Sequence, residues 1–351
     1  MRIAQVTPLY EAVPPRLYGG TERVVAHLTD ALVQLGHEVT LFASAEARTL
    51  ATLAPVRDQA IRLDPAPLKS DLAAHLSQLA EVRRRASEFD VIHFHTDMIH
   101  FPLFEHMADR TVTTLHGRLD LKDLPEVYNR WRQYPLVSIS DDQRRPLPFA
   151  NWAATVHHGM CAELYEFRAK GDGYLAFLGR ISPEKRPDRA IALAIASGRP
   201  LKIAAKVDNA DKLYFEEKIE PLLHHPLVEF IGEIGDDRKS DFLGGADALL
   251  FPIDWPEPFG LVMIEAMAAG TPVIAYDCGS VREVVEEGLT GFIVSDDEAA
   301  LAAIRQIDRL DRAAIRARFE ARFSAVAMAR NYLGLYEQLG APARRAEALS
   351  D

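Results

Sequence analysis

The chain has 351 residues, of which 48% are hydrophobic and 26% are charged, so we expect a globular protein of about two domains. The formal net charge of −11 argues against a protein whose main partner is a nucleic acid, because such binding needs a basic field. Only two cysteines are present, without a Cys-x-x-Cys spacing, which argues against a disulfide framework and a cysteine-based zinc site and fits a reducing compartment.

The first half of the chain alternates short apolar runs with amphipathic stretches. The runs predict strands at Arg2–Leu9, Glu38–Ser44, Asp90–His95, Thr111–Leu115, Leu136–Ser140 and Ala153–His157. A helix is predicted over Gly20–Leu35, with Thr21 as its N-cap and Gly36 just past its end, and another around Asp71–Phe89. The start of the chain lacks the long apolar stretch and cleavage site of a signal peptide, so we interpret it as a buried strand.

A second series of the same kind begins at Tyr174. Its strands are predicted at Tyr174–Gly179, Leu201–Val207, Val228–Ile231, Ala248–Pro252, Pro272–Tyr276 and Phe292–Val294. Its helices are predicted at Pro187–Ala196, Asp211–Leu223, Lys239–Gly244, Phe259–Ala269 and Val281–Glu287. Alternation of this kind implies parallel sheets covered by helices on both faces.

The two series predict an α/β protein made of two doubly wound domains that face a central cleft. We place an N-terminal domain at residues 1–165, a second domain at 166–320 and a C-terminal helix with a tail at 321–351, because residues 166–173 are polar and contain two glycines. In open α/β sheets, ligands bind at the carboxyl ends of the strands. The loops that follow strands are therefore the places where functional residues are expected.

One loop and the helix after it carry the strongest signal, with the sequence Glu257-Pro258-Phe259-Gly260-Leu261 directly after a predicted strand. Pro256 and Pro258 prevent helix before Phe259, so we expect the helix to begin near Phe259. The N–H groups of Phe259 to Leu261 would then form an anion site that suits a diphosphate, and Gly260 would let the ligand approach the backbone.

Two carboxylates flank this helix start. Glu257 and Glu265 are separated by about 12 Å of helical rise, which is too far for an acid–base pair that acts on one atom. We expect them to bind hydroxyls at opposite ends of one long ligand. The alternative is that Glu257 is an ordinary loop charge and Glu265 an ordinary charge on a helix surface.

A second basic loop follows the first strand of the second domain. Gly179 permits a tight exit from the strand, and Arg180 and Lys185 stand before the next helix. A planar guanidinium fork and a compact ammonium charge suit a diphosphate. A solvated basic turn is the simpler interpretation of this loop alone, but the Glu257 loop nearby favours phosphate binding.

The first domain offers glycines and histidines. Gly19 and Gly20 precede the first helix, but they form neither a Gly-x-Gly-x-x-Gly nor a Walker A motif, and a flexible connection explains them equally well. His93 and His95 share one face of a strand, and His116 lies at the end of a strand, where we expect a neutral hydrogen-bonding group. No third ligand follows at a fixed spacing and no Asp-x-Asp occurs, so no metal site is predicted.

Taken together, these motifs resemble the retaining glycosyltransferases of family 4, also called glycosyl transferase group 1, which have the two-domain GT-B fold. The most specific part is the Glu-x7-Glu segment from Glu257 to Glu265, followed by Gly179-Arg180 with Lys185. One departure is His157-His158-Gly159, where similar proteins often have Pro-Asn-Gly.

The resemblance implies transfer of a sugar from a nucleotide diphosphate sugar to a hydroxyl of a glycan, a glycolipid or a small molecule. The anomeric configuration would be retained, and neither a divalent metal nor another cofactor would be needed. Two rival functions are a GT-B-like sugar-nucleotide epimerase or hydrolase and a sugar-nucleotide-binding module without turnover.

The resemblance also implies roles for individual residues. Arg180 and Lys185 would bind the donor diphosphate, Glu265 the ribose hydroxyls and Glu257 the hydroxyls of the donor sugar. Backbone N–H groups of Phe259, Gly260 and Leu261 would face the sugar and phosphate, while Gly19 and Gly20 would pack against the donor. His116 would lie beside the transferred sugar, so the catalytic set would be His116, Arg180, Lys185 and Glu257. The C-terminal helix, Ala325–Leu339, would cross back to the first domain.

The acceptor site is predicted to lie in the first domain. Glu22, Asp97 and His100 are our candidates for its lining. We expect a cytoplasmic protein. The basic run Arg83-Arg84-Arg85 raises the alternative that the protein contacts the inner face of the membrane. A solvated helix face explains this run equally well.

Overall fold

Short parallel strands form the first sheet of the computed structural model, which describes residues 1–16 and 19–347, with residues 341–347 described by their backbone alone. The strands are β1 (Arg2–Val6), β2 (Glu38–Ser44), β3 (Thr52–Arg57), β4 (Val91–Phe94), β5 (Thr111–Thr114), β6 (Leu136–Ser138) and β7 (Trp152–Thr155). Their order in the sheet is β3-β2-β1-β4-β5-β6-β7. All neighbouring strands in this sheet pair in parallel.

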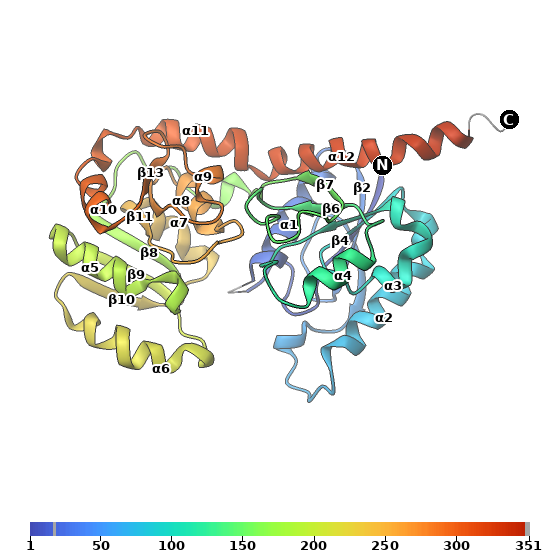
Figure 1. Cartoon of the computed structure of the whole chain (residues 1–351), viewed down its shortest axis with the longest axis horizontal. Coiled ribbons are helices and arrows are strands. Elements are labelled where there is room, and N and C mark those ends of the chain that lie inside the picture. The colour runs from blue at the N-terminus through green and yellow to red at the C-terminus, as the bar shows by residue number, and fades with distance from the viewer. Residues whose placement is uncertain (17–18, 348–351) are drawn as a thin grey trace. The chain divides into compact units, whose positions relative to one another are not determined.

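Helices flank this sheet (Figure 1). They are α1 (Gly20–Gln34), α2 (Asp71–Arg84), α3 (Phe101–Phe104), α4 (Leu124–Arg130) and the long C-terminal helix α12 (Ala325–Glu347). Val24, Val25, Leu28 and Leu32 of α1 are buried, as the helical spacing of apolar residues predicts. Gly36 follows α1 with a φ of 86°, the left-handed conformation that ends many helices.

The second sheet repeats the pattern with its own strands and helices. Its strands are β8 (Tyr174–Arg180), β9 (Leu201–Lys206), β10 (Val228–Gly232), β11 (Ala246–Phe251), β12 (Val273–Tyr276) and β13 (Gly291–Val294), in the order β10-β9-β8-β11-β12-β13. Its helices are α5 (Pro187–Ser197), α6 (Lys212–Tyr214), α7 (Asp236–Gly244), α8 (Leu261–Ala268), α9 (Val281–Val284), α10 (Asp297–Ile304) and α11 (Arg312–Phe323). All pairs are again parallel, so the predicted α/β class with two doubly wound sheets is confirmed.

The chain divides into two packing units. The first unit consists of Met1–Met160 together with the segment from Ala325 onward, and the second is Cys161–Ser324. The backbone N–H of Ala325 donates to the carbonyl of Met160 at 2.8 Å, so the two places where the chain passes between the units are hydrogen-bonded to each other. Helix α12 packs against α1 and buries Tyr332 and Tyr336 in the first unit.

Each sheet reverses its winding direction at one position. In the first sheet, β1, β2 and β3 extend to one side and β4 returns to the other side of β1. In the second, β8, β9 and β10 extend to one side and β11 returns beside β8. Loops at the carboxyl ends of β1 and β4, and of β8 and β11, therefore flank the crevices where doubly wound sheets bind ligands.

The structure corrects several local predictions. Strand β3 was not predicted, because Pro55 interrupts its pattern, and it lies at the sheet edge, where proline is tolerated. The single helix predicted over Asp211–Leu223 is instead α6 followed by a π-helical turn, Phe215–Ile219, and a 3-10 turn that contains Pro221. Thr21 is not the N-cap of α1; Gly19 occupies that position without a side-chain hydrogen bond.

No helix within residues 1–16 and 19–347 has the length and hydropathy of a membrane span.

Candidate functional site

Two loops meet at the carboxyl ends of the neighbouring strands β8 and β11. The backbone N–H of Asp254 donates to the carbonyl of Glu184 at 2.9 Å. The Asp254 carboxylate also pairs with Arg186 at 3.1 Å, and Arg186 has the left-handed φ of 52°. The loop after β11 is therefore held against the loop after β8, at the winding reversal of the second sheet.

Lys185 and Glu257 come together across these loops. The Lys185 ammonium forms an ion pair with Oε2 of Glu257, and the Trp255 indole N–H donates to the same oxygen at 3.0 Å. The Lys185 Nζ atom also lies 5.2 Å from the ring centroid of Trp255 and 5.8 Å from that of Phe251. The two charged side chains are only 17% and 13% exposed, so their charges interact more strongly than a surface pair would.

The loop between β12 and α9 packs against the Glu257 loop and bonds to it. The Ser280 N–H donates to the Glu257 carbonyl at 3.1 Å, and the Ser280 hydroxyl donates to the Phe259 carbonyl at 2.9 Å. Gly279 has a φ of 60°, and a Cβ atom there would lie 2.4 Å from the Glu257 nitrogen. Only glycine fits this contact, so the loop that presents Glu257 has a fixed backbone.

Helix α8 begins later than the sequence predicts. Its N-cap is Gly260, with a φ of 77°, and the first helical residue is Leu261 rather than Phe259. Since the Met263 N–H already bonds to the Gly260 carbonyl, the helix-start donors are the N–H groups of Leu261 and Val262. The Phe259 side chain is buried and meets Phe323 edge-on at 6.2 Å.

Gly260 has a local reason to be glycine in addition to the predicted approach of a ligand. A Cβ atom there would lie 2.8 Å from Met263 and 3.0 Å from Phe251, in a left-handed conformation. The glycine is therefore required by the packing of the loop itself.

Glu265 lies on α8 and is only 2% exposed. Its Oε1 atom accepts hydrogen bonds from the Lys239 ammonium at 2.9 Å and from the Tyr165 hydroxyl at 3.0 Å. Lys239 extends from α7, and it also lies 3.4 Å from Asp236. The carboxylate that was predicted to bind ribose is thus a buried acceptor with a cation beside it, rather than a charge on a helix surface.

Arg180 ends strand β8. Its guanidinium lies 3.3 Å from Glu184 and 3.6 Å from Asp208, and the side chain is partly exposed. The structure therefore places Arg180 at the end of β8 and Lys185 just after it, while Glu257, Gly260, Leu261 and Glu265 lie in the loop after β11 and in α8.

The candidates of the first unit lie in the segments that follow β1, β4 and β5. Gly19 is buried, and a Cβ atom there would lie 2.7 Å from Pro15, while Gly20 begins α1. Glu22 is buried beside Gly19, and this burial raises the pKa of its carboxyl. Asp97 follows β4 and is exposed, with a left-handed φ of 48°.

His100 does not line a surface. Its ring is fully buried and stacks on Phe94 with a centroid distance of 3.7 Å, and its Nε2 bonds to Thr113 at 3.1 Å. Burial also lowers the pKa of His100 well below its usual range. This packing gives His100 a role in the core and argues against the predicted contact with an acceptor.

His116 follows β5 and is partly exposed. Its Nε2 lies 2.9 Å from Nδ1 of His95, and its ring stacks against that of His158 at 5.2 Å. Burial lowers the pKa of His116 to about 3, so the imidazole is neutral at neutral pH. The predicted hydrogen-bonding group is therefore uncharged.

No group of three histidine, cysteine, aspartate or glutamate side chains with metal-binding geometry occurs among the residues that the structure describes. The histidines at the end of the first sheet bond to one another and to Gln5 instead.

Sequence reasoning missed three polar partners in the second unit. Lys239 and Tyr165 lie 26 and 100 positions from Glu265 along the chain, and no spacing rule connects them. Trp255 stands two residues before Glu257 and donates its indole N–H to that carboxylate. This short spacing could have predicted the contact from the sequence.

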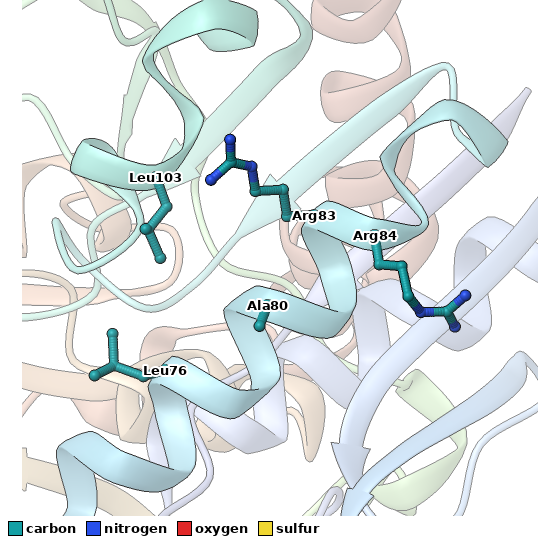
Figure 2. A pocket seen from close by; sticks show the side chains of 5 residues that line it. All are labelled: Leu76, Ala80, Arg83, Arg84 and Leu103. Atoms are coloured by element: carbon teal, nitrogen blue, oxygen red, sulfur yellow. The ribbon is translucent and has the colours of Figure 1, made fainter.

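A shallow hollow lies on α2, away from the strand ends described above. It is lined by Leu76, Ala80, Arg83 and Arg84 of α2 and by Leu103 of α3. Figure 2 shows Arg83 extending on the side of Leu103, whereas Arg84 points the other way. Arg84 and Arg85 pair with Glu81 and Glu88 at 2.6 and 2.7 Å, so much of the charge of the predicted basic run is balanced locally.

Comparison with known proteins assigns a family model to each half of the chain. Residues 18–168 match the model described as "Glycosyltransferase Family 4", and residues 166–321 match the model described as "Glycosyl transferases group 1". Together the two matches cover residues 18–321 without a gap.

Individual relatives agree with these matches. The phosphatidyl-myo-inositol mannosyltransferase of Mycolicibacterium smegmatis is 27% identical over 92% of this chain and 88% of its own length. Among solved structures, AviGT4, a glycosyltransferase involved in avilamycin A biosynthesis, is 25% identical with a TM-score of 0.72, over 97% of this chain and 98% of that one. The Anabaena protein HepE, solved with UDP and glucose, has a TM-score of 0.71 at 20% identity, over 96% of this chain and all of that one.

Proposed function

Because this chain belongs to the glycosyltransferases of family 4 and group 1, we propose that it transfers a sugar from a nucleotide diphosphate sugar to an acceptor hydroxyl, with retention of the anomeric configuration and without a metal ion. The observation that carries this proposal is the convergence of Lys185 and Glu257 at the carboxyl ends of β8 and β11. A cation for the phosphates and an acceptor for sugar hydroxyls lie there side by side.

The second unit would hold the donor. Arg180, Lys185 and the N–H groups at the start of α8 bind the diphosphate, because the two side chains carry positive charge and the helix start presents N–H donors. Glu265 accepts hydrogen bonds from the ribose hydroxyls, and Glu257 accepts them from the transferred sugar. In the first unit, His116 contacts the transferred sugar, and Gly19 and Gly20 lie against the donor.

No side chain is assigned as a covalent nucleophile in this proposal. The acceptor hydroxyl attacks the anomeric carbon from the face that the diphosphate leaves, and the departing phosphate oxygen takes the acceptor proton. Lys185 and Arg180 stabilise the negative charge that develops on the leaving diphosphate. The protein contributes orientation of the two reactants and a fixed electrostatic environment.

A ligand panel followed by a transfer assay tests this function. Thermal shifts with UDP, GDP, ADP and their sugar conjugates should identify one nucleoside diphosphate, since a ligand at 100 times its Kd stabilises the folded state by about 2.7 kcal/mol. UDP is the first choice because HepE was solved with UDP and glucose. We then expect nucleotide release that depends on an acceptor, continues in EDTA and yields a product of unchanged anomeric configuration.

Each alternative has its own outcome in this assay. Product formation without an acceptor would identify an epimerase or hydrolase, and donor binding without release in any acceptor screen would identify a binding module. An inverted product would contradict retention. Activity that EDTA abolishes and Mg²⁺ restores would contradict the metal-free proposal.

We also propose that the first unit contacts an anionic membrane surface through α2. Leu72, Leu76, Ala80 and Arg83 follow one another at helical spacing on an exposed face, and the two leucines are 50% and 45% exposed. Arg83 forms no ion pair with the side chains that the structure describes. Exposed leucines with a terminal cation suit the interface of an anionic bilayer. The mannosyltransferase relative, named for phosphatidyl-myo-inositol, supports a lipid-linked acceptor.

Vesicle binding tests this contact. We expect the protein to sediment with vesicles of phosphatidylglycerol and phosphatidylcholine, and the double variant Leu72→Asn with Leu76→Asn to bind at least tenfold more weakly, because each buried CH₂ contributes about 0.8 kcal/mol. Leu213→Asn, at a leucine that is 64% exposed in the second unit, is the matched control and should bind normally. Equal binding by the double variant, or equal binding to pure phosphatidylcholine, would refute an anionic membrane contact through α2.

A further inference from the structure

A chain of hydrogen bonds crosses the core of the first unit and ends at His116. The Gln5 amide nitrogen donates to the Tyr336 hydroxyl of α12 at 3.3 Å. The Gln5 amide oxygen lies 2.7 Å from Nε2 of His95, and Nδ1 of His95 lies 2.9 Å from Nε2 of His116. Gln5, His95 and Tyr336 are buried, so water does not replace these contacts.

The orientation of the Gln5 amide gives this chain a direction. Its oxygen can only accept a hydrogen bond, so Nε2 of His95 carries the proton and donates. A neutral imidazole carries one N–H, and Nδ1 of His95 is therefore an acceptor. Nε2 of His116 must then donate to it, which leaves Nδ1 of His116 with a lone pair.

The same amide orientation also sets the direction of a side branch of the network. The Tyr336 hydroxyl accepts from Gln5 and can therefore donate to Nδ1 of His93 at 2.7 Å. Nε2 of His93 is then protonated and donates to the Thr114 hydroxyl at 2.7 Å. Every polar group in the branch thus has a partner of the opposite kind.

Nδ1 of His116 differs from the other atoms of the network. It is buried and makes no hydrogen bond within the part of the chain that the structure describes. A buried acceptor without a partner costs free energy, which a ligand hydroxyl that donates to it would recover. Burial also lowers the pKa of His95 and His116, so both rings stay neutral and keep a defined tautomer.

We propose that Gln5 and His95 are positioning residues that hold His116 in the Nε2–H tautomer, so that its Nδ1 accepts a hydrogen bond from a hydroxyl of the transferred sugar. This inference rests on the proposed function for the identity of the ligand. It adds that the contact selects a sugar that donates a hydrogen bond at this position, and that His116 transfers no proton.

The tautomer can be measured on the protein alone. In NMR spectra of protein labelled with ¹⁵N in its histidine rings, with the His116 signals assigned by their loss in His116→Gln, we expect Nδ1 of His116 to be unprotonated and Nε2 to be protonated. Because no donor or acceptor is present, this measurement does not depend on whether the protein transfers a sugar. A protonated Nδ1 in the wild-type protein would overturn the proposal.

Two buried glutamines then provide a matched pair of variants. Gln5→Met removes the acceptor from His95, whereas Gln78→Met removes a fully buried glutamine that donates to the carbonyls of Thr7 and Phe42 outside the network. We expect Gln5→Met to give a mixture of His116 tautomers and about a tenfold loss in kcat/KM, the effect of roughly one hydrogen bond. Gln78→Met should lower thermal stability while keeping the single tautomer and wild-type kcat/KM.

The outcomes separate this inference from the proposed function. An unchanged tautomer in Gln5→Met, or the same loss of kcat/KM in both variants, would overturn the positioning role. If the NMR result holds but His116→Gln leaves transfer unaffected, the contact of His116 with the sugar is wrong, and the proposal about sugar selection is overturned with it.

Discussion

Replacing Lys185 by alanine is expected to lower kcat/KM for sugar transfer by roughly 100- to 1,000-fold, the usual effect of removing one group that stabilises transition-state charge. Lys185 lies beside Glu257 with little exposure to water, so its charge acts on a bound diphosphate without much screening. The fold should survive, because Trp255 still donates to Glu257 and Ser280 still holds the loop.

Steady-state kinetics and thermal unfolding of three variants check this result. Lys212→Ala is the matched control, since Lys212 of α6 forms an exposed ion pair with Glu216 at 3.6 Å. Lys185→Arg keeps the charge but changes its geometry, and we expect it to retain part of the activity. Turnover within threefold of the wild type in Lys185→Ala would remove Lys185 from the site.

Glu265→Gln is expected to weaken donor binding by roughly 10- to 150-fold, because hydrogen bonds to a charged acceptor contribute about 1.5–3 kcal/mol. The effect should appear mainly in the KM for the donor, since ribose lies far from the reacting carbon. Glutamine keeps an oxygen for Lys239 and Tyr165, so the buried contacts of α8 persist in part.

Calorimetry with two ligands separates the ribose contact from a general loss of structure. The wild type should bind the nucleoside diphosphate more tightly than its 2′,3′-dideoxy analogue, and Glu265→Gln should bind the two almost equally. Glu216→Gln, on the exposed stretch after α6, should behave as the wild type. If Glu265→Gln still discriminates fully between the two ligands, Glu265 does not hold the ribose hydroxyls.

Much of the fold followed from local features of the sequence. Short apolar runs predicted the positions of most strands, because strands that are buried on both faces of a parallel sheet are continuously apolar. The prolines before Phe259 correctly predicted a sharp loop after β11, although the helix begins two residues later, where Gly260 takes a left-handed conformation. Strand β3 was missed because an edge strand tolerates the proline that a central strand excludes.

The side chains that surround the candidate site residues were less predictable from the sequence. Glu265 could be selected from its motif, but its partners Lys239 and Tyr165 come from α7 and from the segment before β8, and tertiary packing alone brings them together. The burial of His100 argues against the predicted contact with an acceptor, because this residue, directly before α3, turns inward. It stacks on Phe94 and bonds to Thr113 in the core.

The return of the chain at Ala325 has a consequence for the order of folding. The second unit, Cys161–Ser324, is continuous and can be completed while the protein is still being synthesised. The first unit cannot be completed so early, because Tyr332 and Tyr336 follow the whole second unit in the chain. These two tyrosines bond to Thr114, His93 and Gln5. A nascent chain thus holds a complete second unit before the first unit acquires its final hydrogen bonds, and a chain truncated before α12 would never acquire them.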